Sequence, residues 1–199
     1  MSASSKLAII IVIGLLIVFA GIFVLYGVSL YNSIIKADED TKAAWAQVLN
    51  QYQRRSDLIP NLVDTVQAYA AHEKEVLTKV TEARSRVGSF KIDESILNDP
   101  AKLKQFQQMQ GELSSAISRL LVVAENYPNL KANENFLGLQ AQLEGTENRI
   151  AVERMRFVDA INTYNKKVRT FPGSLFSYQT KPNFTAEEGA EKAPKNLFK

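Results

Sequence analysis

The pattern of apolar and polar positions divides the chain into one uninterrupted apolar run and a longer region of helical periodicity. Residues 7–28 (LAIIIVIGLLIVFAGIFVLYGV) contain no charged, amide or proline side chain. As a helix this run is ~33 Å long, slightly more than the ~30 Å hydrocarbon core of a bilayer. A cleaved signal peptide has a shorter apolar core of ~7–15 residues. We therefore predict a short flank over residues 1–6 and an uncleaved transmembrane anchor over residues 7–29.

After the anchor, apolar residues recur at steps of three and four as far as Gly88, which is typical of an amphipathic helix. Pro60 interrupts this pattern because it lacks an N–H and because its ring clashes with the carbonyl of Ser56 in a continuous helix. Residues 32–88 are therefore predicted to form either one kinked helix or two helices that meet near Ile59.

Two further long helices are predicted in the second half of the chain. The first starts at residues 98–100, where an Asn or Asp cap precedes a proline, and it ends or bends at Tyr127–Pro128. The second follows Asn129 and stops at residues 171–173, and several of its apolar residues lie seven apart, as in a bundle or coiled coil. No strand-like alternation is found. The fold class is therefore all-α, with a helical domain over residues 30–172 that has three long helices, or four if the first breaks at Pro60.

The C-terminal tail, residues 173–199, is rich in Gly, Pro, Lys, Glu and Ala and contains only isolated large apolar side chains. Such a segment cannot bury a core of its own. Two alternatives follow for the tail, partial docking along the helical domain or a disordered extension.

Composition excludes several classes of function. The 24 basic residues exceed the 21 acidic residues by only three, so we expect no nucleic-acid partner, whose usual footprint is a basic stripe. The chain has no cysteine, which excludes disulfides, thiolate metal sites and a cysteine nucleophile. The few lysines beside the anchor slightly favour a cytoplasmic N-terminus and leave the side of the helical domain open.

His72 is the only histidine and therefore the first candidate for catalysis or metal binding. A zinc-protease motif that began at His72–Glu73 would need a second histidine where Val76 stands. A di-iron motif would need a glutamate in place of Tyr69. We also find no Gly-rich loop after a strand for phosphate. We therefore expect no enzyme, no metal, no other cofactor and no small-molecule substrate.

Two groups of polar residues are candidate contact surfaces. The first is a polar stripe for a partner protein, beside the apolar stripe of the predicted helix, and comprises Asp57, Asn61, Asp64, His72 and Glu75. Its alternative is a solvated face with local pairs such as Arg54 and Asp57. The second is a basic cluster near the end of the last long helix, formed by Lys166, Lys167 and Arg169. These cations either complement the helix dipole or contact anionic lipid headgroups.

Several motifs along the chain resemble the signature of the LemA family. They are Tyr31–Asn32, Ala44–Trp45, residues 55–63 (RSDLIPNLV), 69–73 (YAAHE), 127–132 (YPNLKA) and 136–140 (FLGLQ), Tyr164–Asn165 and Phe171–Pro172. The resemblance covers about residues 7–185. It implies a single N-terminal membrane helix followed by an antiparallel, mainly four-helix up-and-down bundle, and it implies no settled molecular function. Descriptions of the family often place the N-terminus outside the cell, opposite to the orientation that the charges favour.

Together these patterns predict a single-pass protein of a cell membrane, the bacterial inner or plasma membrane, that acts by binding or assembly. The first hypothesis is a structural or scaffolding protein that self-associates in contact with membrane lipid, because a common anchor raises the effective concentration of the helices. The alternative is a monomeric interaction module that recruits or regulates other envelope proteins, such as membrane proteases.

Overall fold

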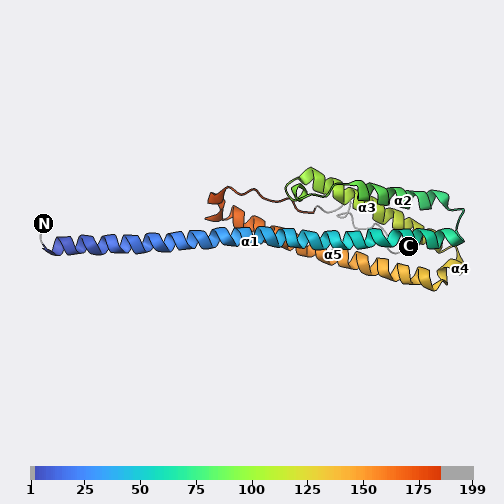
Figure 1. Cartoon of the computed structure of the whole chain (residues 1–199), viewed down its shortest axis with the longest axis horizontal. Helices are drawn as coiled ribbons and strands as arrows, with labels where there is room; N and C mark the ends of the chain where they lie inside the picture. Colours follow the sequence, from blue (N-terminus) through green and yellow to red (C-terminus); the bar gives the residue numbers. More distant parts are fainter. Residues whose placement is uncertain (1–2, 185–199) are drawn as a thin grey trace, which may run out of the picture.

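The structure is a computed structural model that describes residues 3–184 (Figure 1). Its first helix, α1 (Ala3–Tyr69), has 67 residues and runs without interruption from the apolar run to the far end of the helical bundle. No strand occurs among residues 3–184, so the predicted all-α class is confirmed for this part of the chain.

The other helices lie beside the second half of α1 (Figure 1). They are α2 (Lys74–Ser89), the short 3₁₀ helix η1 (Glu94–Leu97), α3 (Pro100–Ala124), α4 (Pro128–Lys131), α5 (Glu134–Arg169) and the 3₁₀ helix η2 (Gly173–Phe176). The predicted start of α3 is confirmed, because the Asp99 side chain accepts hydrogen bonds from the backbone N–H groups of Ala101 and Lys102.

Residues 32–88 form neither of the two predicted arrangements. α1 continues through Pro60, as the one-helix alternative required, but it ends at Tyr69. The break therefore lies at residues 70–73, not near Ile59, and residues 32–88 are not one helix. Pro60 cannot donate to the carbonyl of Ser56. Instead, Nε of Arg84 on α2 donates to that carbonyl at 3.0 Å. A side chain from the neighbouring helix thus replaces the missing backbone donor.

α5 packs along α1 in the opposite direction. Lys167, near the end of α5, contacts Ser33 on α1, whereas Glu147, earlier on α5, contacts Arg55, later on α1. The two helices are therefore antiparallel. The α5 side of this contact is a buried seven-residue repeat, Phe136, Leu143, Ile150, Phe157 and Tyr164. These large side chains fill the contact at every second turn, which explains why the predicted period of seven appears in the sequence.

The apolar run lies outside the bundle (Figure 1). Between residues 11 and 28, its large apolar side chains are 51–72% exposed. By length and composition, α1 is the one helix within the described residues that is able to cross a membrane.

Residues 177–184 of the tail return along α1 and α5. Lys181 is buried, its Nζ lies 2.9 Å from a carboxylate oxygen of Asp38, and its backbone exchanges hydrogen bonds with the Asn165 side chain. The ring of Phe184 lies 6.1 Å from that of Trp45 and 5.2 Å from that of Phe157. This part of the tail is docked, and residues 185–199 lie outside the described residues.

Candidate functional sites at the two ends of the bundle

The predicted polar stripe is divided between three segments. Asp57, Asn61 and Asp64 share one exposed face of α1, and Asp57 accepts a hydrogen bond from Gln53 at 2.7 Å, not from the predicted Arg54. Because α1 ends at Tyr69, the other two residues leave this face. Exposed His72 lies in the connection to α2, and Glu75 in the first turn of α2 forms an ion pair with Lys79. The five residues are all exposed, but they do not form one helical stripe.

The basic cluster is also divided. Nζ of Lys167 donates to the backbone carbonyl of Ser33 at 3.1 Å and to its Oγ at 2.6 Å, so this lysine joins α5 to α1. Lys166 and Arg169 are exposed in the last turn of α5. Two of the three predicted cations therefore face solvent, at the end of the bundle next to the apolar run.

An apolar surface that the sequence pattern did not predict lies beside these cations. We call it the proximal patch, and it comprises the exposed side chains of Tyr31, Phe171, Leu175 and Phe176. Phe171 is 81% exposed and Leu175 is 68% exposed. The Phe176 ring lies 5.9 Å from the Tyr31 ring, so η2 is seated on α1 where the helix leaves the apolar run.

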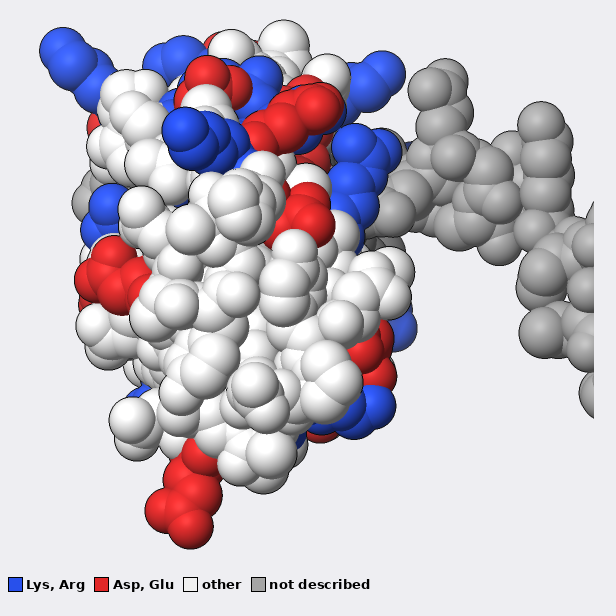
Figure 2. All heavy atoms as spheres, turned by 90° about the vertical axis from the view of Figure 1, so that its right-hand side faces the viewer, with Lys and Arg blue, Asp and Glu red and all other residues white. Residues whose placement is uncertain are grey.

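The opposite end of the bundle is largely uncharged, as Figure 2 shows. The end of α1, the end of α3, α4 and the start of α5 all lie there (Figure 1). We define the distal patch by seven exposed residues of this end that are not Lys, Arg, Asp or Glu: Tyr69, Ala71, His72, Asn126, Pro128, Asn129 and Ala132.

Side-chain contacts hold the connections of the distal patch in place. The Tyr127 hydroxyl donates to Glu73 at 2.9 Å, and this hydrogen bond raises the pKa of Tyr127 above its ordinary value. Nδ2 of Asn133 donates to the Tyr69 hydroxyl at 3.0 Å and ties the start of α5 to the end of α1. Lys131 pairs with Glu125. These charged groups are engaged locally, which leaves the patch between them uncharged.

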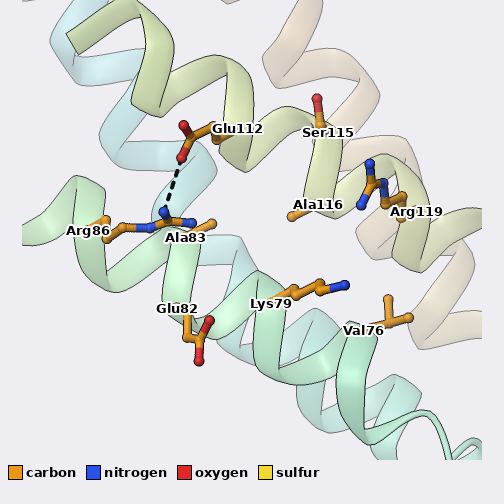
Figure 3. Close-up of a pocket in the computed structure, with 9 residues that line it drawn as sticks. All are labelled: Val76, Lys79, Glu82, Ala83, Arg86, Glu112, Ser115, Ala116 and Arg119. Carbon is orange, nitrogen blue, oxygen red and sulfur yellow. Dashed lines mark ion pairs between the residues drawn. The ribbon is translucent and has the colours of Figure 1, made fainter. Parts of the chain in front are cut away.

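A groove of about 580 Å³ runs between α2 and α3 (Figure 3). Ala83 on α2 and Ala116 on α3 line this groove with small side chains. The side chains around it carry both signs of charge: Lys79, Glu82, Arg86, Glu112 and Arg119. Arg86 and Glu112 form an ion pair across it at 3.3 Å (Figure 3). The groove is open and mixed in charge, which suits a protein surface better than a small apolar ligand.

One charged side chain lies inside the bundle. Arg55 on α1 is only 1% exposed and donates to Ser114 on α3 at 2.6 Å and to Glu147 on α5 at 2.7 Å. It also donates to Gln110, and its guanidinium stacks 5.1 Å from the ring of Tyr52. We call Arg55 and its partners the Arg55 node. It connects three helices and thereby fixes their register. The sequence signal for it was a charged residue at position 55 within the apolar stripe of the predicted helix.

Among the described residues, no group of three or more His, Cys, Asp or Glu side chains is placed to hold a metal ion. Taken together, the fold and its surfaces define an all-helical protein with one helix long and apolar enough to cross a membrane. Exposed apolar side chains lie at one end of its bundle, and a largely uncharged surface lies at the other.

The model of the LemA family matches residues 44–198, and the chain belongs to this family. The resemblance predicted from the motifs is thus confirmed. Similar proteins include magnetosome protein MamQ 2 of Paramagnetospirillum magneticum, which is 26% identical over 75% of this chain and 61% of its own length. Protein LemA of Metamycoplasma hominis is 24% identical over 76% of this chain and 65% of its own. The chain spans less than two thirds of the length of these relatives. Their names carry no enzymatic activity.

Proposed function

We propose that this protein is a membrane-anchored, non-enzymatic scaffold that holds a protein-binding end at a fixed distance from the bilayer. The observation that carries this proposal is the unbroken α1 helix, which joins the apolar run to the distal patch. At about 1.5 Å per residue, the stretch from Val28 to Tyr69 is ~60 Å long. An up-and-down order of the four long helices would stiffen this stretch along its whole length.

The distal patch is the surface we assign to the partner protein. Exposed charges are depleted at the centres of protein interfaces because their desolvation is costly. The local contacts of Tyr127, Asn133 and Lys131 hold the connections in one arrangement, so little conformational entropy is lost when a partner binds. This assignment replaces the stripe from Asp57 to Glu75 as the main candidate and retains only its His72.

Photo-crosslinking in native membranes tests this proposal. A photoreactive residue at Asn129 in the distal patch should give a discrete adduct, and one at exposed Asn148 on α5 should not. Ala132→Glu places a charge in the patch and should abolish the adduct. Ala141→Glu introduces the same charge at an exposed alanine of α5 and should leave the adduct intact. An adduct that persists with Ala132→Glu would contradict the proposal.

Self-association is the second candidate, and the α2–α3 groove favours it. Its mixed charges are able to match those of another copy, and anchoring in one bilayer raises the effective concentration of copies. Mass photometry of the full-length protein in detergent should then show a discrete oligomer. Arg119→Glu at the groove should dissociate it, whereas Arg149→Glu on α5 should not. A monomer for the unsubstituted protein would exclude this candidate.

A further inference from the structure

Two side chains of the proximal patch are as exposed as those of the apolar run or more so. Phe171 is 81% exposed and Leu175 is 68% exposed, against 51–72% for the large side chains between residues 11 and 28. A large apolar side chain is more stable when it is buried than when it is left in water. Two such side chains four residues apart on one short segment indicate that the segment meets an apolar partner.

The segment that carries the patch has one defined position on the bundle. Gly173 is buried, and a Cβ atom there would lie 2.0 Å from the carbonyl oxygen of Lys167, so only glycine fits this close approach to α5. On the other side, the Phe176 ring packs against Tyr31 of α1. Phe171 and Leu175 are therefore presented outward by a turn that is fixed on both sides.

The level of this turn along α1 identifies the partner. Tyr31 lies about 4.5 Å along the helix beyond Val28, the last residue of the apolar run. The headgroup layer on each side of a bilayer is about 5–8 Å thick. The turn beside Tyr31 therefore lies within that layer when the apolar run spans the hydrocarbon core. Aromatic side chains concentrate at this depth, and the neighbouring cations Lys166 and Arg169 suit the phosphate groups found there.

We propose that the proximal patch inserts into the interfacial layer of the membrane, where Phe171 and Leu175 form a second, shallow attachment beside the transmembrane helix. We assign lipid as the partner of the proximal patch because the patch is continuous with the apolar run. Two attachments at different positions on the bundle would fix the direction in which the whole domain tilts. This inference does not depend on which protein binds the distal patch.

The absence of cysteine from the sequence permits a direct test. A polarity-sensitive fluorophore is attached to Leu175→Cys in the full-length protein, with one copy in each lipid nanodisc. Val122→Cys on α3 is the matched control, because Val122 is also 68% exposed. The label at residue 175 should be quenched by lipids that carry a nitroxide near the headgroup and protected from iodide in the water. The label at residue 122 should show the reverse.

Equal quenching by iodide at the two positions would overturn the proposal. Protection from iodide at residue 175 without quenching by the nitroxide lipid would also overturn it, because a protein surface would then cover the patch. Phe171→Ser in the background of Leu175→Cys should weaken the lipid quenching, since half of the attachment is lost. Quenching that appears only with anionic lipids would assign the contact to Lys166 and Arg169 and overturn apolar insertion.

Discussion

The α1–α5 pair and the α2–α3 pair hold the same bundle together by different means. The α1–α5 contact extends over the full length of α5 and buries large side chains seven residues apart. The α2–α3 contact is shorter, uses alanines at residues 83 and 116, and leaves an open groove on its surface. We infer that the first pair is a column that determines the distance between the two ends, and that the second pair is a brace along its side.

The largest expected loss of stability comes from truncating a buried side chain in the middle of the column. Phe157 is fully buried against Trp45, and Phe157→Ala should lower the free energy of unfolding by about 3–5 kcal/mol. Leu120 on the brace is equally buried, and Leu120→Ala should cost less, about 2–3 kcal/mol. Urea unfolding in detergent, followed by circular dichroism, measures both values. Equal costs would contradict the distinction between column and brace.

The next effect concerns the node that joins the column to α3. Arg55→Met removes the donors to Gln110 and Ser114 and should cost about 2–3 kcal/mol, because the buried Gln110 amide is left without its partner. Gln110→Leu added to Arg55→Met should recover most of this loss, since an apolar pair needs no donor. Urea unfolding of the single and double variants tests the coupling, and additive costs would show that the node does not act as a unit.

A smaller effect is expected where the brace supports the column at Pro60. Arg84→Met leaves the carbonyl of Ser56 without a donor and should cost about 1–2 kcal/mol. In the background of Pro60→Ala, a backbone N–H again reaches that carbonyl, so Arg84→Met should cost almost nothing. A double-mutant cycle by thermal unfolding gives the difference. The same cost in both backgrounds would assign Arg84 to ordinary packing.

The smallest expected effect is a pH-dependent weakening of the contact between residues 177–184 and the column. Burial raises the pKa of Asp38, but its hydrogen bonds with Lys181 and Lys42 outweigh burial and leave the pKa below the ordinary value of 3.8. A carboxyl group whose pKa is lowered by folding stabilises the folded state at pH values above its ordinary pKa. This stabilisation is lost as the pH falls through the lowered pKa.

The tail segment should therefore be held less tightly as the pH falls below about 4 and through the lowered pKa of Asp38. Fluorescence of Trp45, the only tryptophan, reports this change through its contact with Phe184. Asp38→Asn should remove the pH-dependent step. A step of the same size in Asp38→Asn would assign it to other groups.

Features that depend on local or periodic signals were predictable from the sequence. The apolar run, the start of α3 at Asp99 and the seven-residue repeat of α5 were recognised because their causes lie within a few turns of the chain. The sequence left open whether the helix continues through Pro60, because the donor that replaces the missing N–H is Arg84, which lies 28 positions after Ser56 in the sequence.

The same limit applies to the candidate sites. Lys167 looked like one of three equivalent cations, but its partner Ser33 is 134 positions away, and only the fold reveals that it is engaged. The proximal patch was not predicted, because Phe171 was interpreted as part of a helix stop and Leu175 as part of a tail without a core. Their meaning depends on the level of Tyr31 beside them, which is a property of the packed structure.

The unbroken α1 helix has a mechanical consequence. Transmembrane helices tilt by ~20° on average, and they tilt more when the bilayer is thinner than their apolar length. Because α1 continues rigidly for ~60 Å beyond the apolar run, a 20° change in tilt would displace the distal end sideways by roughly 20 Å. If the apolar run spans a bilayer as proposed, the thickness of that bilayer would determine where the distal patch lies relative to its partner protein.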